Sequence, residues 1–195
     1  MAIAKGTKNR LIETTLHLYL KGGLEAVSMR KVAEHADLST MAAYRHFKNK
    51  DDLLNHVVME GFNRFQAYFS RANTIPDPVA SLKLCMTLYA EFALKQPEFY
   101  EMMFMAKLRS EDPQLEKRSQ QQIQMALLFL KARVTKCVST GLINEVDPNA
   151  CALRLWSLCH GMVSLQVLGQ LHEPEGFNSF YRQSIEQFFI ELGIN

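Results

Sequence analysis

All six prolines of this 195-residue chain lie at or beyond Pro76, and three of them directly follow an aspartate. An Asp-Pro pair suits a helix start, because the carboxylate accepts hydrogen bonds from the first turn and the first helical position needs no donor. Asp77-Pro78, Asp112-Pro113 and Asp147-Pro148 therefore predict three helix starts. Elsewhere apolar residues recur at helical spacing, and almost no segment alternates as a strand does. We predict an all-α fold.

The periodicity predicts about nine helices with short connections. Their expected ranges are 5–21, 28–35, 39–46, 50–72, 78–95, 98–109, 113–139, 148–170 and 175–191. The first range ends at Gly22-Gly23, and the fourth begins after Asn49, whose side chain can cap it. Because the fourth helix is long and no flexible linker is present, we expect it to connect two domains, residues 1–48 and residues 49–195.

Positive charge is concentrated at the N-terminal end of the chain. The formal net charge is only +2, yet residues 1–50 carry nine Lys or Arg against four Asp or Glu, and residues 61–195 carry thirteen of each. Basic charge at one end is expected where only that end meets a polyanion. A solvated basic face without a partner would give the same counts, so charge alone leaves both interpretations open.

Composition excludes several classes of protein. Hydrophobic residues make up 48% of the chain and charged residues 22%, as in ordinary globular proteins. No apolar run reaches the roughly 18 residues of a membrane span, and the first ten residues show no signal-peptide pattern. The four cysteines form no CxxC pair and indicate buried thiols in a reducing compartment. We therefore expect a cytoplasmic protein that does not bind membranes.

The segment from Ser28 to Lys50 predicts a helix-turn-helix motif. Ser28 and Ser39 can each cap a short helix, and residues 36–38 form a tight connection between the two. Small side chains on the second helix would let its backbone approach the base edges of the DNA major groove. The residues expected to face outward there are Ser39, Thr40, Met41, Ala42, Tyr44 and Arg45.

Three side chains of this segment are spaced to reach DNA phosphates. Tyr44, His46 and Lys50 offer a hydroxyl, an imidazole and an ammonium donor. Such contacts fix the register of a protein on DNA without recognising its sequence. Taken singly, Tyr44 is more often a partly buried aromatic residue and His46 an ordinary surface residue. The residue types by themselves thus leave the motif a hypothesis.

The wider pattern resembles the TetR family of bacterial transcriptional regulators, without a gap, over roughly residues 8–56. The resemblance rests on Ile12, Leu16, Tyr19-Leu20, Gly23-Leu24-Glu25-Ala26-Val27-Ser28, Val32-Ala33, Ala36-Asp37-Leu38-Ser39 and Tyr44-Arg45-His46-Phe47-Lys48-Asn49-Lys50-Asp51-Asp52-Leu53-Leu54. It implies that Tyr44, His46 and Lys50 contact phosphates. It implies contacts to bases or nearby backbone by Ser28, Arg30, Thr40, Met41 and Ala42.

Two positions depart from the family pattern. Family members usually have glycine in the turn, where this chain has Asp37, a residue that adopts the left-handed conformation at some cost. Many members carry Thr-Leu-Tyr where this chain has Ala42-Ala43-Tyr44, so a hydroxyl is missing from the side that faces DNA. The resemblance therefore implies the fold without specifying which bases are contacted.

The last two predicted helices carry extensive apolar surface. The helix after Asp147 is apolar almost all round, with Arg154 as its only charge, and the last helix has an aromatic stripe. Two such helices at a chain end favour a two-fold, four-helix dimer interface, and the resemblance likewise implies a homodimer. The expected interface residues are Leu155, Leu158, Met162, Leu165, Phe177, Phe180, Tyr181 and Phe188. The alternative is that they complete the core of a monomer.

The resemblance also implies a small-molecule pocket in the C-terminal domain. Candidates are Phe65, Phe69, Tyr89, Phe92, Met102, Met103, Phe104, Met125, Phe129, Trp156, Cys159 and His160. Methionines adapt to varied apolar ligands, although a methionine and aromatic stripe is more often plain core. Since charged residues do not cluster in this region, we expect a neutral or weakly polar effector. Trp156-x-x-x-His160-Gly161 also resembles the tryptophan–histidine–glycine pattern of one group of TetR-family C-terminal domains.

Sequence motifs for catalysis are missing. The chain has no GxGxxG, P-loop, HExxH or GxSxG, and no His, Cys, Asp and Glu grouping with metal-ligand spacing. We therefore expect no catalytic residue, no metal and no cofactor. The favoured function is a dimeric repressor that a small effector releases from palindromic operator DNA. The alternatives are a DNA-binding regulator without an effector and a helical enzyme or lipid carrier.

Overall fold

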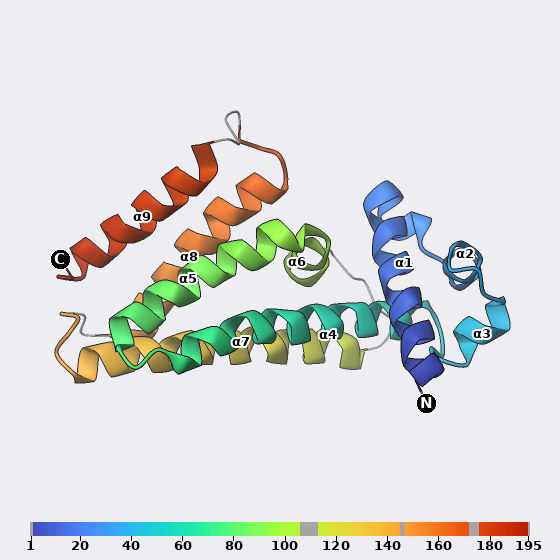
Figure 1. The fold of residues 1–195 in the computed structure, drawn as a ribbon, viewed down its shortest axis with the longest axis horizontal. Coiled ribbons are helices and arrows are strands. Elements are labelled where there is room, and N and C mark those ends of the chain that lie inside the picture. Colours follow the sequence, from blue (N-terminus) through green and yellow to red (C-terminus); the bar gives the residue numbers. More distant parts are fainter. Residues whose placement is uncertain (1, 106–112, 145–146, 172–175, 195) are drawn as a thin grey trace. The chain divides into compact units, whose positions relative to one another are not determined.

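The computed structural model describes residues 2–105, 113–144, 147–171 and 176–194. These ranges contain nine α-helices and one 3-10 helix, and no strand (Figure 1). The chain divides into two compact units. The N-terminal unit comprises residues 1–63 and 98–119, and the C-terminal unit comprises residues 64–97 and 120–195. The predicted all-α fold is confirmed.

The N-terminal unit is built from short helices around a small apolar core. Its helices are α1 (Ala2–Ala26), α2 (Met29–His35), α3 (Thr40–Tyr44), α6 (Pro97–Phe104) and the first part of α4 (Lys50–Phe69). Its fully buried side chains include Leu11, Val32, Ala33, Ala43, Leu53, Val57 and Tyr100. Regular helix geometry in α1 breaks at Gly22 and Gly23, and Gly23 has a φ of 63°. The predicted stop of the first helix is therefore confirmed.

The helix α6 closes the core of the N-terminal unit against α4. Gly61 of α4 has no room for a side chain, because an added Cβ would lie 2.6 Å from Met103 Sδ and 3.1 Å from Phe99 Cδ1. The rings of Phe62 and Phe104 meet edge to face, 5.9 Å apart. The glycine therefore lets two helices that are distant in sequence approach closely.

A partly buried hydrogen bond joins α6 to α1 in the same unit. Tyr19 Oη donates to Glu101 Oε1 at 3.1 Å. Burial, with the neighbouring Glu101 charge, raises the pKa of Tyr19 to about 12. The tyrosine is thus a neutral donor to the carboxylate at physiological pH.

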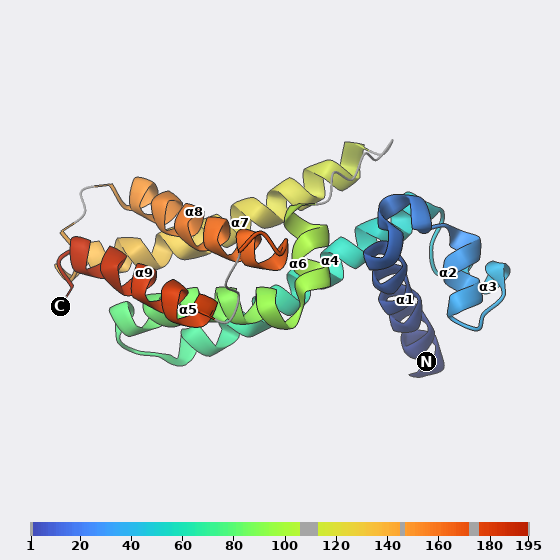
Figure 2. The ribbon, with the colours of Figure 1, turned by 90° about the horizontal axis from the view of Figure 1, so that it is seen from above.

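The C-terminal unit is a helical bundle centred on α5. It contains η1 (Ser70–Thr74), α5 (Pro78–Lys95), α8 (Pro148–Val167), α9 (Phe177–Glu191) and most of α7 (Pro113–Ser139). The helices α8 and α9 lie alongside α5 (Figure 2). The fully buried residues include Leu82, Cys85, Leu88, Phe92, Val134, Cys137, Cys151, Leu155, Val163 and Phe189. All four cysteines are free and buried, which confirms the prediction of buried thiols.

All three predicted Asp-Pro helix starts are confirmed, since α5, α7 and α8 begin at Pro78, Pro113 and Pro148, and two of the three aspartate caps are observed. Asp77 Oδ1 accepts from Ala80 N at 2.6 Å at the start of α5. Asp147 Oδ1 accepts from Asn149 N at 2.9 Å at the start of α8. The third expected cap, Asp112, lies outside the described residues.

Four predicted helix ends lie further along the chain than the observed ones, because the expected ranges 39–46, 50–72, 98–109 and 148–170 end as α-helix at Tyr44, Phe69, Phe104 and Val167. The expected range 50–72 ends as α-helix at Phe69 and continues as the 3-10 helix η1. The expected range 148–170 ends at Val167, because Gly169 adopts a φ of 64° and its N–H bonds back to Gln166 O. Local end geometry of this kind is not encoded in apolar spacing.

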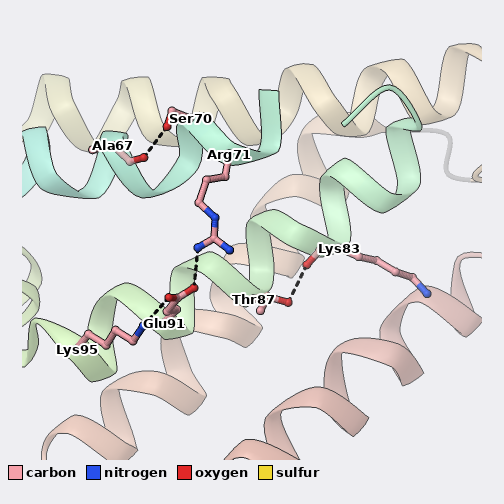
Figure 3. A network of polar contacts seen from close by, with 7 residues as sticks. All are labelled: Ala67, Ser70, Arg71, Lys83, Thr87, Glu91 and Lys95. Carbon is pink, nitrogen blue, oxygen red and sulfur yellow. Dashed lines mark hydrogen bonds and ion pairs between the residues drawn. The ribbon is translucent and has the colours of Figure 1, made fainter. Parts of the chain in front are cut away.

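A network of ion pairs covers one exposed side of α5 (Figure 3). Glu91 pairs with Arg71 at 3.1 Å and with Lys95 at 2.7 Å, and the hydrogen bond from Lys95 is the main cause of its lowered pKa. Nearby, Ser70 donates to Ala67 O and Thr87 donates to Lys83 O. Exposed pairs of this type contribute less than about 1 kcal/mol each, so they order the surface rather than hold the bundle.

In the described ranges of the chain, no helix combines the length and the apolar character needed to cross a bilayer.

Replacing Gly61 by alanine should destabilise the N-terminal unit. Overpacking against Met103 and Phe99 costs about 1–3 kcal/mol, and the gain of about 1 kcal/mol from better helix propensity offsets only part of it. Urea denaturation should therefore show a net loss of up to about 2 kcal/mol. Gly6→Ala is the matched control, because nothing lies within 4 Å of its added Cβ. Equal stability of both variants would contradict the close packing of α6 on α4.

Candidate nucleic-acid interface

The helices α2 and α3 form the predicted helix-turn-helix and pack against each other. Ser28 Oγ accepts from Lys31 N at 3.2 Å and begins α2. Ser39 Oγ accepts from Ala42 N at 3.1 Å and begins α3. Each serine satisfies backbone donors that the first helical turn would leave unpaired. Both predicted caps are confirmed.

The turn between the two helices passes through Asp37 in a left-handed conformation. Its φ is 50°, and among the described residues it is the one non-glycine residue with positive φ. Leu38 N bonds back to Ala33 O at 2.9 Å, and Arg10 donates to Asp37 O at 3.4 Å. The aspartate therefore does what glycine usually does at this position in the family, with a Cβ in a strained region.

Several predicted DNA-contact residues lie on the exposed side of the motif. Met41 is 68% exposed and Tyr44 is 48% exposed, although both carry large apolar surfaces. Arg30, Ser39 and Arg45 are exposed, whereas Ser28, Thr40 and Ala42 are half-buried. The buried side of α3 is Ala43, which is fully enclosed. The helix thus presents polar, basic and apolar groups together to solvent.

Lys50 and His46, two of the residues predicted to contact phosphates, are less exposed and are held by contacts within the chain. Lys50 Nζ donates to Leu24 O at 2.6 Å and so binds the end of α1 in the same unit. Its ammonium keeps two further protons for other acceptors. His46 is half-buried, with its ring 6.3 Å from Phe47. The sequence pattern did not predict the Lys50 anchor, because it joins residues 26 positions apart.

Reciprocal capping fixes the loop between α3 and α4. Asn49 Oδ1 accepts from Asp52 N at 2.8 Å, and Asp52 Oδ2 accepts from Lys48 N at 2.8 Å. This is a variant of the capping box in which Asp52 accepts from the N–H of the residue before the cap, and it confirms the predicted cap at Asn49. His56, one turn on, lies against the same carboxylate at 3.4 Å. The acidic first turn also complements the positive end of the helix dipole.

Comparison with known families agrees with this geometry. A family model described as bacterial regulatory proteins, tetR family, matches residues 11–57. A second model, described as tetracyclin repressor-like, C-terminal domain, matches residues 82–188, which is more than half of the chain. The chain belongs to the TetR family.

One curated relative of this TetR-family chain is the HTH-type transcriptional repressor KstR of Rhodococcus jostii (strain RHA1). It is 34% identical over 101 residues, which cover 51% of this chain and 46% of KstR. The chain therefore matches less than half the length of that relative.

Solved structures show the same fold at low identity. The TetR family transcriptional regulator PfmR from Thermus thermophilus superposes with a TM-score of 0.77 at 21% identity, over 92% of this chain and 94% of PfmR. AibR, in complex with isovaleryl coenzyme A and operator DNA, gives a TM-score of 0.75 at 23% identity, over 94% of this chain and 98% of AibR. The likeness shows an N-terminal helix-turn-helix domain and a C-terminal helical domain.

Part of the predicted pocket set forms one aromatic cluster in the C-terminal unit of this TetR-family protein. Phe65 lies 4.6 Å from Phe69, 5.8 Å from Tyr89 and 5.2 Å from Phe92, measured between ring centroids. Phe69 meets Phe129 of α7 at 5.7 Å. These five of the twelve candidates form one cluster, and ring contacts of His160 with Tyr89 at 6.5 Å and with Trp156 at 5.6 Å extend it to seven.

A polar pair lies next to this cluster. Tyr89 Oη and His160 Nδ1 are 2.8 Å apart, and the His160 ring lies 5.6 Å from Trp156. Burial lowers the pKa of His160, so its ring is neutral at pH 7 and can accept a hydrogen bond from the Tyr89 hydroxyl. Cys159 is buried and its Sγ lies 3.3 Å from Met86 Sδ.

The remaining pocket candidates lie elsewhere. Met102, Met103 and Phe104 belong to the N-terminal unit, where α6 packs on α4. Met125 is 54% exposed on α7, so it lines no buried cluster. Three hollows described in the C-terminal unit are lined by residues that do not belong to the twelve pocket candidates. Apolar spacing could not separate these cases, because it does not show which helix a stripe packs against.

The predicted dimer residues divide into buried and exposed sets. Leu155, Met162, Phe177 and Tyr181 are buried within the C-terminal unit, and Tyr181 Oη donates to Met86 O at 2.7 Å. Leu158 and Phe188 are half-buried, while Leu165 and Phe180 are 42% and 55% exposed. The prediction omitted three further exposed apolar residues of these helices, Leu153, Leu168 and Ile190. A helical wheel that tracks the outer face of α8 would have found Leu168, three residues after Leu165.

Asp37 should respond differently to two replacements. Asp37→Gly removes the Cβ from a left-handed residue and should leave stability unchanged or raise it by up to about 1 kcal/mol. Asp37→Val places a β-branched side chain in the same conformation and should lower the free energy of unfolding by about 1–3 kcal/mol. Urea denaturation of both variants measures the difference. A valine variant as stable as the glycine variant would contradict the positive φ at this turn.

Proposed function

We propose that this chain is a homodimeric transcriptional repressor that binds palindromic operator DNA through α3 and releases it when a small effector binds the C-terminal domain. The observation that carries the proposal is the capped α2-turn-α3 motif with Met41 and Tyr44 exposed on its outer side. The family match over residues 11–57 supports it. In this proposal residues 1–48 bind DNA, residues 49–195 bind the effector and the second copy, and the protein acts in the cytoplasm.

In the proposed complex, α3 lies in the major groove. Small and polar side chains at its N-terminal end, Ser39, Thr40 and Ala42, contact bases, with Met41 packing on apolar edges. Tyr44, Arg45, His46 and the two free protons of Lys50 contact phosphates. Ser28 and Arg30 of α2 contact the backbone beside the groove. Two motifs in a dimer reach half-sites about 34–36 Å apart, or a multiple of one helical turn.

The proposed dimer interface uses the outer faces of α8 and α9. Leu165 and Leu168 of α8 and Phe180 of α9 leave large apolar surfaces in water, whose removal from solvent favours association. Gly161 has nothing within 4 Å of an added Cβ, so it leaves room for a closely packed partner helix. Leu158 and Phe188 form the half-buried edge of this surface, whereas Leu155, Met162, Phe177 and Tyr181 support it from inside.

The proposed effector site is the aromatic cluster of the C-terminal unit with the Tyr89–His160 pair as its polar contact. Repacking of Phe65, Phe69 and Phe129 would admit an apolar body, and the pair offers one hydrogen-bonding position. AibR binds isovaleryl coenzyme A, which is one precedent for a small branched acyl group on this fold. The Trp156-x-x-x-His160-Gly161 pattern supports membership of the tryptophan–histidine–glycine group.

Release of DNA requires that the effector favour one conformation. An effector shifts the equilibrium only by its difference in affinity for the two states. The helix α4 contributes residues to both units and follows the capping box, so it is the element through which a change would reach the motif. The alternative without an effector predicts a filled bundle whose melting temperature no small molecule raises.

Tyr44→Phe tests the proposed phosphate contact. Loss of one hydroxyl donor to a charged acceptor costs about 1.5–3 kcal/mol, so affinity should fall at least about tenfold on specific and random duplexes alike. The operator is first obtained by in vitro selection on random duplex DNA, and affinity is then measured by fluorescence anisotropy at several salt concentrations. Tyr68→Phe is the matched control, because Tyr68 is a half-buried tyrosine of the C-terminal unit.

Selection without enrichment of any sequence, combined with no duplex binding at low salt, would overturn the DNA-binding proposal. An affinity of Tyr44→Phe that equals that of Tyr68→Phe at every salt concentration would overturn the proposed phosphate contact of Tyr44.

The double variant Leu165→Asp, Phe180→Asp tests the interface. Both side chains are exposed within one chain, so the charges should leave the fold intact and prevent association. Light scattering should give twice the mass of one chain for the unaltered protein and a monomer mass for the variant, whose operator affinity should also fall. Leu128→Asp is the control, because Leu128 is 60% exposed on α7. A variant that remains a dimer would show that another surface associates.

A further inference from the structure

A hollow of about 270 Å³ lies in the C-terminal unit between α7 and the segment that joins η1 to α5. Its apolar wall is formed by Ala72, Ile75, Pro76, Pro78 and Ala132. Its polar groups come from Asn73, Ser81, Arg133 and Lys136. Ser81 Oγ already donates to Ala72 O. The cations of Arg133 and Lys136 are therefore the polar groups of the lining that remain available to bind a ligand. The volume is near the lower end of small-molecule sites, which begin at about 300 Å³.

Arg133 is held rigidly at this hollow. Its guanidinium carbon lies 3.5 Å from the centroid of the Phe129 ring, and Nη2 donates to Asn73 Oδ1. Nη1 makes a long contact of 3.4 Å to Phe129 O. Nε is buried and has no hydrogen-bond partner. Stacking and two neutral acceptors thus orient the planar group without neutralising it.

The positive charge of Arg133 is not balanced by an acidic side chain. Among the residues that the structure describes, no carboxylate lies within ion-pair distance of it. Asp77, between the two prolines of the wall, keeps its negative charge, but it accepts from Ala80 N at the start of α5 and forms no ion pair with Arg133 among the described contacts. Burial raises the pKa of the nearby Cys85 thiol to about 11 despite the opposing charge of Arg133, so the thiol stays neutral. A half-buried cation that only neutral groups contact is costly unless an anion joins it.

Lys136 adds a second unbalanced charge one turn along α7. It lines the same hollow, is exposed, and makes no ion pair with any described carboxylate. Two cations at positions i and i+3 share one face of a helix. Together they place two cations beside an apolar wall.

We propose that this hollow binds the anionic group, a carboxylate or a phosphate, of a small molecule whose apolar part packs on Ile75, Pro76 and Ala132. Arg133 offers its planar fork to two oxygens of that group, and Lys136 offers a mobile ammonium from the rim. Since Phe129 contacts both Arg133 and Phe69, the anion site adjoins the aromatic cluster. The inference rests on the proposed effector-dependent repressor and gives its effector a negative charge, where the sequence predicted a neutral or weakly polar one.

Three probes distinguish the chemistry: sodium valerate, its neutral isostere valeramide, and inorganic phosphate. Binding is measured by calorimetry at constant ionic strength with the full chain, and by the melting temperature at saturating probe. Valerate, phosphate or both should bind and raise the melting temperature by a few degrees, whereas valeramide should bind at least tenfold more weakly. The anion that binds more tightly shows whether the charged group of the ligand is a carboxylate or a phosphate.

Variants then assign the site. Arg133→Met keeps a side chain over the Phe129 ring and should weaken anion binding at least tenfold, and Lys136→Met should weaken it less. Arg182→Met is the control, because Arg182 is an exposed cation of α9 that lines a different hollow. If Arg133→Met fails to fold by circular dichroism, Arg133→Gln, which retains donors to Asn73, replaces it.

The inference is overturned if neither anion binds the unaltered protein, or if the anions bind the Arg133 variant as tightly as the Arg182 variant. Operator binding without any probe is measured in parallel on the unaltered protein. Operator binding without anion binding would refute this site alone, and anion binding without operator binding would refute the repressor proposal alone.

Discussion

Burial of Phe47 is the interaction on which the candidate DNA-binding surface depends. The helix α3 has only five residues, and helices of that length are not stable by themselves. Phe47 is 1% exposed, donates its N–H to Ala43 O at 3.0 Å and meets the His56 ring edge to face at 5.2 Å. It therefore holds the end of α3 against the first turns of α4. With Ala43 buried on the inner side, Met41 and Tyr44 can only face outward.

The N-terminal unit is more than a continuous N-terminal segment. Residues 98–119 join residues 1–63 in one compact unit. The missing Cβ of Gly61 and the Tyr19–Glu101 hydrogen bond explain why, since they place α6 directly against α4 and α1. The proposed domain boundary at residue 48 reflects the DNA-binding function, whereas the bounds of the two compact units reflect how the helices pack. A conformational change in α6 would therefore act on the core of the unit that contains α2 and α3, without passing through a flexible linker.

Local chemistry explains which parts of the structure could be predicted from the sequence. The caps at Ser28, Ser39, Asn49 and Asp77 depend on residues two to four positions away, so the sequence contains all the information needed. The left-handed conformation at Asp37 could also be predicted, because it depends on a local turn at which the family pattern usually has glycine. The Lys50 anchor on Leu24 O, by contrast, depends on a fold in which α1 and α4 already meet.

The charge on Arg133 shows why the effector could not be inferred from composition. The basic and acidic residues of the C-terminal part balance in number, so no excess of positive charge is apparent along the chain. Among the described acidic residues, Glu91 pairs with Arg71 and Lys95, Glu186 pairs with Lys83, and Asp77 caps α5. Arg133 is left with an aromatic ring, an amide and a carbonyl as neighbours. In the proposed site, selection of an anion would therefore depend on how the charges are distributed, with the Arg133 guanidinium next to the aromatic cluster favouring an amphipathic acid over its neutral analogue.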